Sequence, residues 1–299
     1  MELDLLGEKE IASFLKVQPG TVHQWRKRGL LPSPAAVVSG VPVWQRSAIE
    51  AWAIGSDRLP HSPQVAATIS TILSDAAAGI LQRLSRSSLG RRFYLAGGTA
   101  LALHLNHRVS RDLDFFPTTP SFTLNTMRIL DELARLFRPQ DYSLRVREAG
   151  QLNLDIQGTK VAFIAYPFAL EDRLVKHPLG SLASVGDIAA MKAYSIGRRA
   201  VSRDYIDLYY ILARGLISMD ELVVKAERIF ILDGKPVFDA LLFAKQLTYT
   251  DDLEDVSSVM DDVVDKDLSW TKVQEFLKEA SAQWLARHIV HNIEDGVEL

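Results

Sequence analysis

Residues 93–118 constrain this chain most, because they combine a glycine turn, a helix and an acidic strand in one order. The apolar run Phe93–Leu95 predicts a short strand that ends at Gly97 and Gly98, and Thr99 is suited to cap the helix that follows. Two glycines at a helix N-terminus let a phosphate approach free backbone N–H groups. Taken alone, this pattern is equally typical of a turn that holds no ligand.

Two aspartates follow in a strand pattern. Asp112 and Asp114 would project from one face of the strand, while Leu113 and Phe115 would enter the core. Two adjacent carboxylates repel each other unless a cation joins them, and Mg²⁺ commonly joins one or two carboxylates to substrate phosphates. The alternative is an edge strand with two solvated aspartates.

A second segment begins at Ser184, which predicts the start of a helix that carries Lys192. Ser202 predicts the start of the next helix. On that helix Asp204 and Asp207 are three residues apart and therefore share a face. The alternative is a surface helix with ion pairs.

The order G-G-T-A-L-A-L-H-L-N-H-R-V-S-R-D-L-D-F-F resembles the signature of polymerase-β-type nucleotidyltransferases. More narrowly, it resembles the AbiEii/AbiGii-type nucleotidyltransferase toxins of abortive-infection and type IV toxin–antitoxin systems. The second pattern of that family is K-x-x-A-x-x-x-R-x-x-x-R-D-x-x-D. In this chain we assign to this pattern Lys192, Arg198, Arg203, Asp204 and Asp207. The small residue follows the lysine directly, as Ala193, and Ser195 stands at the third position after the lysine, where the pattern has alanine.

The resemblance, together with this chemistry, implies a nucleotide site built on the first segment. Asp112 and Asp114 would hold Mg²⁺ on the triphosphate and on the attacking hydroxyl. Gly97, Gly98 and Thr99 would cradle the β- and γ-phosphates.

The second segment would complete the site. Lys192 would place a charge on the triphosphate, with assistance from Arg198. Asp204 and Asp207 would fix Lys192 and Arg203 by ion pairing, or Asp204 would act on the acceptor as a base. These two roles of Asp204 stay open.

A third carboxylate is common in polymerase-β-type enzymes, and residues 152–168 form the matching hairpin pattern. The strand from Lys160 to Tyr166 carries no acid, so Asp155 on the partner strand is the sole candidate. Either Asp155 serves, or Asp112 and Asp114 suffice.

The first 54 residues predict a separate module of two helices, a hairpin at Ser39-Gly40 and a closing helix. Residues 5–53 resemble the winged helix-turn-helix of the MerR and excisionase type. In that layout Thr21 would open the second helix, which would present to DNA the side chains of Thr21, His23, Gln24, Arg26, Lys27 and Arg28. The alternatives are a solvated basic helix end and a protein-binding module.

We therefore expect an α+β chain with three domains and one linker. They are a small winged helix-turn-helix domain (1–54), a linker (55–63), a nucleotidyltransferase-fold mixed sheet with helices (64–180) and a C-terminal helical bundle that completes the active site (181–299). Helical patterns cover 64–89, 219–229, 236–247 and 270–289.

The charge balance is misleading when it is taken over the whole chain. The 34 Lys and Arg residues against 37 Asp and Glu residues give a net charge of −3, which would disfavour a nucleic-acid partner. Residues 251–267 alone hold eight acids and one lysine, and the rest has 33 bases and 29 acids, or +4. The acidic segment is either a solvated, partly flexible stretch or a patch for a basic antitoxin.

Composition excludes other classes. The chain has no cysteine, so thiolate zinc sites and Cys nucleophiles are excluded, and no apolar run is long enough for a membrane span. We expect a cytoplasmic protein with no membrane partner.

The sequence thus predicts a Mg²⁺-dependent nucleotidyltransferase that moves an NMP from an NTP to an acceptor hydroxyl. The resemblance implies a toxin with tRNA ends as the leading acceptor. The alternatives are a DNA-binding regulator whose transferase domain senses a nucleotide without catalysis, and transfer to a protein or to a small molecule such as an antibiotic.

Overall fold

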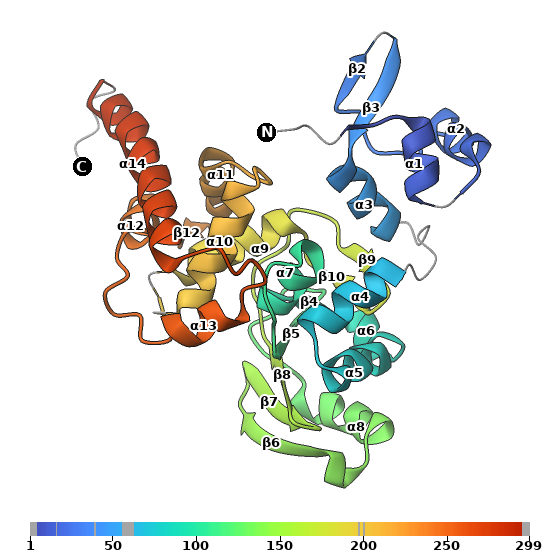
Figure 1. Cartoon of the computed structure of the whole chain (residues 1–299). Helices are drawn as coiled ribbons and strands as arrows, with labels where there is room; N and C mark the ends of the chain where they lie inside the picture. Colours follow the sequence, from blue (N-terminus) through green and yellow to red (C-terminus); the bar gives the residue numbers. More distant parts are fainter. Residues whose placement is uncertain are drawn as a thin grey trace. The chain divides into compact units, whose positions relative to one another are not determined.

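A computed structural model of the chain describes residues 5–15, 17–38, 40–55, 63–196, 198–199 and 201–294 (Figure 1). Residues 56–62 of the expected linker and Ser39 of the expected hairpin turn lie outside them. The chain divides into two compact units, Met1–Ala66 with Val175–Pro178 and Ala67–Leu174 with Leu179–Leu299. Among the described helices, none has the length and apolar character to span a bilayer.

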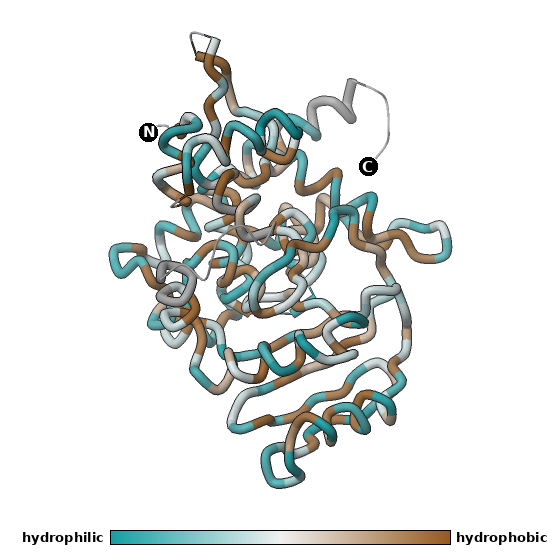
Figure 2. The backbone as a smooth tube through the Cα atoms, turned by 90° about the vertical axis from the view of Figure 1, so that its right-hand side faces the viewer, coloured by the Kyte–Doolittle hydropathy of each residue, from teal (hydrophilic) through white to brown (hydrophobic). Residues whose placement is uncertain are grey.

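The first unit contains two helices, a hairpin and a third helix. Its elements are β1 (Leu5–Leu6), α1 (Glu8–Phe14), α2 (Pro19–Lys27), β2 (Ala36–Val38), β3 (Val41–Gln45) and α3 (Arg46–Gly55), and the strands pair in the order β1-β3-β2. Ile11, Val22 and Trp44 lie at the centre of its core. The β2–β3 hairpin is hydrophobic near its tip, where Val38 and Val41 are exposed (Figure 2).

The second helix of this unit begins earlier than expected. It starts at Pro19 and not at Thr21, because the fixed φ of proline suits the first helical position and its missing N–H is not needed there. The single helical pattern expected after residue 64 is divided into three helices. They are α4 (Pro63–Ile72), α5 (Asp75–Ser85) and α6 (Leu89–Arg92). Ser74 ends the first of these and caps the second, since its hydroxyl accepts from the Ala77 N–H at 3.2 Å.

A mixed sheet forms the centre of the second unit. Its strands are β4 (Phe93–Ala96), β5 (Asp112–Pro117), β6 (Tyr142–Arg147), β7 (Gln151–Ile156), β8 (Thr159–Ile164) and β10 (Gly180–Leu182), in the order β6-β7-β8-β5-β4-β10. The strand β9 (Val175–His177) belongs to the first unit. β5 is antiparallel to β4 and parallel to β8. Helix α7 (Gly97–Leu105) connects β4 to β5, and α8 (Thr126–Leu136) and the short η1 (Pro139–Asp141) follow β5.

The register of β5 determines where its acidic residues point. Leu113 is fully buried and Phe115 nearly so, which leaves the two aspartates on the opposite face as the alternation predicts. The Cα partners of Asp114 are Ala96 on β4 and Ala162 on β8. Small neighbours on both sides leave space above the Asp114 carboxylate.

Helices form the remainder of the second unit. They are α9 (Val185–Ser195), α10 (Ser202–Ala213), α11 (Met219–Ile229), α12 (Ala240–Gln246), α13 (Val256–Asp262) and α14 (Trp270–Glu294), with a small hairpin of β11 (Ile231–Leu232) and β12 (Lys235–Pro236). Helix α9 packs against α7, α10 and α11, and α14 packs against α10, α11 and α12 (Figure 1).

The helix expected at 219–229 is confirmed with its bounds, whereas two other expectations were wrong in part. Pro236 belongs to β12, so the next helix starts only at Ala240. The acidic segment is not simply solvated, because it contains α13 and buries Val259 and Val263.

Candidate active site

A cavity of about 390 Å³ lies between the N-terminus of α7, the strand β5 and the helices α9 and α10. Its volume falls in the range of small-molecule sites. One part of its wall is polar and charged: Gly97, Gly98, Arg108, Ser110, Asp112, Asp114, Lys192, Arg199, Arg203 and Asp204. Another part is apolar and aromatic: Phe116, Ile164, Tyr166, Ile188, Met191 and Tyr194.

The two glycines allow close approach to the backbone. Gly97 has φ +65°, which strains any L-residue, and a Cβ there would lie 2.8 Å from the Asp114 Oδ2. A Cβ on Gly98 would collide with the Arg108 guanidinium. The N-cap of α7, Ala96, offers no side-chain cap, so the first N–H groups of the helix are not satisfied by a capping side chain.

Thr99 does not cap this helix. It lies buried in the first turn, where its hydroxyl is 2.7 Å from the Ser110 hydroxyl and also contacts the Asp112 carbonyl oxygen. Its side chain is not part of the cavity wall described above. The Thr99 side chain therefore joins α7 to the start of β5, and the glycines before it face the cavity.

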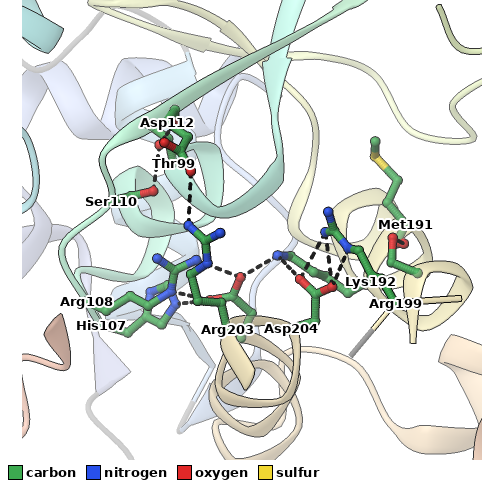
Figure 3. Close-up of polar contacts among 12 residues, drawn as sticks. Thr99, His107, Arg108, Ser110, Asp112, Met191, Lys192, Arg199, Arg203 and Asp204 are labelled. Atoms are coloured by element: carbon green, nitrogen blue, oxygen red, sulfur yellow. Dashed lines mark hydrogen bonds and ion pairs between the residues drawn. The ribbon is translucent and has the colours of Figure 1, made fainter. Parts of the chain in front are cut away.

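Asp112 and Asp114 both line the cavity. Burial raises the pKa of Asp114, and the charge of Asp112 raises it further, whereas Lys192, Arg199 and Arg203 lower it. The Arg203 guanidinium lies 3.0 Å from the Asp112 Oδ2 (Figure 3). Two close carboxylates repel each other when both are ionised, so the pair is suited to bind a further cation.

The donor set of this pair fits Mg²⁺. Its ligands are carboxylate oxygens, and Mg²⁺ typically takes one or two carboxylates and fills its other positions with waters and substrate phosphates. Within the described ranges, no group of three or more His, Cys, Asp or Glu side chains is arranged to hold a metal. Asp112 and Asp114 would thus form a partial site that a triphosphate completes.

Asp155 lies outside this site. Its Oδ1 accepts from the Gly158 N–H at 2.9 Å, and its Oδ2 is 3.7 Å from Arg145. It therefore caps the β7–β8 turn and does not belong to the cavity wall. The expectation that Asp155 could supply a third carboxylate is not supported by its position.

Lys192 is buried and is held by two carboxylates of α10. Its Nζ lies 2.6 Å from the Asp204 Oδ1 and 2.7 Å from the Asp207 Oδ2. Ser184 caps α9, the helix that carries Lys192, by accepting from the Asp187 N–H at 2.9 Å. Ser202 does not cap α10, because Val201 holds the N-cap position and Ser202 is the first residue of the helix. Among the described residues, its hydroxyl has no hydrogen-bond partner.

Asp207 is fully buried among three basic side chains. Arg108 donates from Nε to Oδ1 at 2.7 Å and from a terminal nitrogen to Oδ2 at 3.0 Å, and the His107 Nε2 lies 2.7 Å from Oδ1. Burial alone would raise the pKa of Asp207, but the charges of Arg108 and Lys192 hold it well below its ordinary value. Asp207 is therefore an ionised anchor for Lys192.

Arg203 and Arg198 have other partners than the sequence predicts. Arg203 contacts Asp112 and not the α10 carboxylates. Arg198 donates from its two terminal nitrogens to the carbonyl oxygens of Tyr194 and Val237, both at 2.8 Å. Arg198 lines the cavity, but two of its N–H donors already have acceptors in the backbone.

The sequence reasoning missed Arg199, His107 and Arg108. Arg199 reaches the Asp204 carboxylate at 3.0 Å (Figure 3). It is also the residue seven places after Lys192, where the family pattern has its first arginine, so strict counting would have found it. The roles of His107 and Arg108 depend on contacts 100 and 99 residues away in the chain, which no local pattern shows.

The residues expected to contact DNA lie in the first unit. Glu8 of α1 pairs with two of them, at 3.2 Å with the His23 Nδ1 and through the Arg26 guanidinium. Gln24, Lys27 and Arg28 are exposed, and Thr21 is half-buried.

A sequence comparison identifies the second unit. Residues 79–287, more than two thirds of the chain, match the family described as nucleotidyl transferase AbiEii toxin, type IV TA system. An uncharacterized protein of Aquifex aeolicus (strain VF5) is 29% identical over 215 residues, which cover 69% of this chain and 94% of that protein.

Two solved structures are also similar. MenT4, a nucleotidyltransferase toxin of Mycobacterium tuberculosis H37Rv, is 17% identical with a TM-score of 0.48, over 80% of this chain and 85% of that one. JHP933 from Helicobacter pylori is 14% identical with a TM-score of 0.43, over 78% and 99%. The family match covers every residue of the cavity wall. The chain is therefore a nucleotidyltransferase that belongs to the AbiEii toxin family of type IV toxin–antitoxin systems.

Proposed function

We propose that this nucleotidyltransferase transfers an NMP from an NTP to a hydroxyl of a nucleic-acid acceptor, with tRNA the favoured class, and that it depends on Mg²⁺. The observation that carries the proposal is the grouping of a glycine turn, two carboxylates and an anchored lysine around one cavity. The family implies an NTP substrate and an antitoxin partner.

The reaction joins the acceptor oxygen to the α-phosphorus and breaks the bond between the α-phosphorus and the oxygen that bridges it to the β-phosphate. Pyrophosphate leaves, and the acceptor hydroxyl loses its proton. The backbone N–H groups at Gly97 and Gly98 are placed to bind phosphate oxygens, which orients the triphosphate against β5.

Asp112 and Asp114 would hold Mg²⁺. When bound there, the ion would neutralise charge on the triphosphate and lower the pKa of the attacking hydroxyl. Asp112 would also set the position of the acceptor side, because it borders a second cavity as well as the first.

Lys192 would stabilise the charge that develops on the leaving pyrophosphate. A lysine side chain has many rotamers, and the two carboxylates of α10 restrict it to one position. Both oxygens of Asp204 accept from cations, since Arg199 contacts it besides Lys192. These contacts favour a fixing role for Asp204 over the role of a base.

A second cavity of about 250 Å³ supports a nucleic-acid acceptor. It is bordered by Asp112 and by the basic residues Arg108, Arg111, Lys160 and Arg203, with Asp262 as the other acid. Arg111 is ion-paired with Asp262, and Lys160 is exposed beside β5. Basic side chains beside the carboxylates suit the phosphates of an incoming strand.

The acceptor proposal is tested by charge reversal at this second cavity. We expect Lys160→Glu and Arg111→Glu to reduce the labelling of total RNA by a labelled NTP while NTP binding is unchanged. Lys235→Glu, an exposed lysine on β12, is the matched control and should label RNA as the wild type does. Labelling of protein or of a small molecule in a lysate, with RNA unlabelled, would contradict a nucleic-acid acceptor.

Toxicity is tested in cells. Expression of the wild type should arrest growth, and Asp112→Ala or Lys192→Ala should abolish the arrest. Arrest that persists in both variants would contradict a catalytic toxin and favour the alternative of a nucleotide-sensing regulator.

We also propose that the N-terminal unit binds DNA through α2. The proposal is supported by the order of two helices, a hairpin and a third helix, and by the exposed Gln24, Lys27 and Arg28. Its test is a mobility shift on the DNA upstream of its own gene at several salt concentrations. Binding should weaken steeply as salt rises, and salt-independent binding would contradict phosphate contacts.

A further inference from the structure

Two planar side chains of the cavity wall, Tyr194 and Arg198, form a stack with Phe230 that the phosphate chemistry does not use. The rings of Phe230 and Tyr194 are stacked, with centroids 4.1 Å apart and an interplanar angle of 15°. The Arg198 guanidinium carbon lies 3.6 Å from the centroid of the Tyr194 ring. Because Phe230 covers one face of that ring, the guanidinium covers the other.

The hydrogen bonds of Arg198 hold its plane in place. Its two terminal nitrogens donate to the carbonyl oxygens of Tyr194 and Val237, both at 2.8 Å, on two different elements of the unit. A guanidinium fixed in this way presents its flat face more than its N–H edge. Arg198 is exposed and lines the cavity, so this outer face is accessible to a ligand.

Tyr166 adds an aromatic ring to the same wall of the cavity. Its ring packs edge-on against Phe116 and Phe168, and Phe168 in turn contacts both Tyr194 and Phe230. The Tyr166 hydroxyl is fully buried, so a ligand in the cavity can contact the ring and not the hydroxyl.

We propose that this surface, formed by Arg198, Tyr194 and Phe230 with Tyr166 beside it, binds the base of the NTP. The base stacks on the outer face of Arg198, and the ring of Tyr166 adds apolar contact area in the same cavity. Guanidinium planes and aromatic rings are common stacking partners of bases. The inference rests on the proposed function, since it assigns the base end of the same substrate.

The proposal separates two roles that Arg198 could have. A phosphate contact needs charge, which Arg198→Lys retains, whereas a stacking surface needs a plane, which the lysine lacks. Inorganic tripolyphosphate has the charged part of the substrate and no base. Comparing the two ligands therefore shows which part of the NTP Arg198 contacts.

The experiment is equilibrium binding to the full-length protein in the presence of Mg²⁺. The ligands are the α,β-methylene analogues of ATP, GTP, CTP and UTP, and tripolyphosphate. We expect Arg198→Lys to weaken the tightest-binding analogue about tenfold, in the range measured for base stacking, and to leave tripolyphosphate affinity unchanged. We expect Tyr166→Ala, which removes the ring from the cavity wall, to weaken the same analogue and to leave tripolyphosphate affinity unchanged.

Two results would overturn the proposal. Equal weakening of analogues and tripolyphosphate by Arg198→Lys would assign Arg198 to the phosphates. Unchanged analogue affinities in both Arg198→Lys and Tyr166→Ala would exclude a base site here. Nucleotide transfer is measured separately. If the variants change analogue binding as expected but the wild type transfers no nucleotide, only the proposed function is contradicted.

Discussion

Arg108 and Asp207 form a fully buried bidentate ion pair beneath the glycine turn, with distances of 2.7 and 3.0 Å. The pair links the segment before β5 to α10, and the same carboxylate holds Lys192 at 2.7 Å. Asp207 thus connects Arg108, which lies against Gly98 of the glycine turn, to the lysine of α9.

The first prediction concerns Gly98, which lies against this pair. In Gly98→Ala the new methyl group collides with the Arg108 guanidinium, which cannot move without breaking its bonds to Asp207. We expect the free energy of unfolding to fall by about 1–3 kcal/mol and NTP binding to weaken. Gly79→Ala in α5, where a Cβ meets open space, should instead stabilise the protein by about 0.5–1 kcal/mol. Chemical denaturation measures both, and equal effects of the two changes would refute the role of the Gly98 contact.

The second prediction concerns Asp207. Asp207→Asn leaves Arg108 and Lys192 buried beside a neutral group, and we expect a loss of about 3–5 kcal/mol in the free energy of unfolding. Asp220→Asn removes a half-exposed pair with Arg287 and should cost about 0.5 kcal/mol or less. A loss for Asp207→Asn as small as that of the control would mean that the buried pair does not anchor the site.

The third prediction concerns pH. Burial lowers the pKa of His104 from its ordinary 6.5, against an opposing contribution from its hydrogen bond to the Ala183 carbonyl oxygen. When the pKa of a histidine is lower in the folded than in the unfolded state, its contribution to the free energy of unfolding is complete above the unfolded pKa of 6.5. This contribution declines as the pH falls from 6.5 toward the folded-state pKa. Burial lowers the pKa of His107 in the same direction.

We therefore expect the free energy of unfolding to decrease between pH 7.5 and pH 5.5 in the wild type. In His104→Gln, where the amide can still donate to Ala183, the decrease should be smaller because the side chain does not titrate. Denaturation curves at both pH values measure the difference. The same decrease in wild type and variant would show that His104 does not contribute.

The fourth prediction compares two serines at helix starts. Ser184 caps α9, so Ser184→Ala should cost about 1 kcal/mol of unfolding free energy. The Ser202 hydroxyl is buried without a hydrogen-bond partner, so Ser202→Ala should be neutral or stabilising. Thermal denaturation tests the pair, and a larger loss at Ser202 would restore it as the cap of α10.

These two serines show what a sequence can predict. Both fit the N-cap pattern, but the second one lies inside its helix, directly after the N-cap Val201, and its hydroxyl makes no capping hydrogen bond. Local rules located the glycine turn, the faces of β5 and the bounds of α11, because alternation and helical periodicity act within a few residues.

Such local rules could not predict long-range contacts. The bond between Thr99 and β5, the pairing of Arg203 with Asp112 and the anchoring of Lys192 by Asp207 together with Arg108 all depend on how separate elements pack. The acidic segment shows the same limit, since its average charge predicts solvent exposure, whereas Val259 and Val263 bury it against the helices.

The most direct test of the account is the transfer of label from an NTP. The full-length protein is incubated with Mg²⁺, total RNA and NTPs labelled on either the α- or the γ-phosphate. The wild type should label RNA from the α-labelled NTP only, since pyrophosphate carries the γ-label away, and Asp112→Asn should label nothing. Labelling from the γ-phosphate, or equal labelling by wild type and Asp112→Asn, would contradict nucleotide transfer at the site formed by Asp112, Asp114 and Lys192.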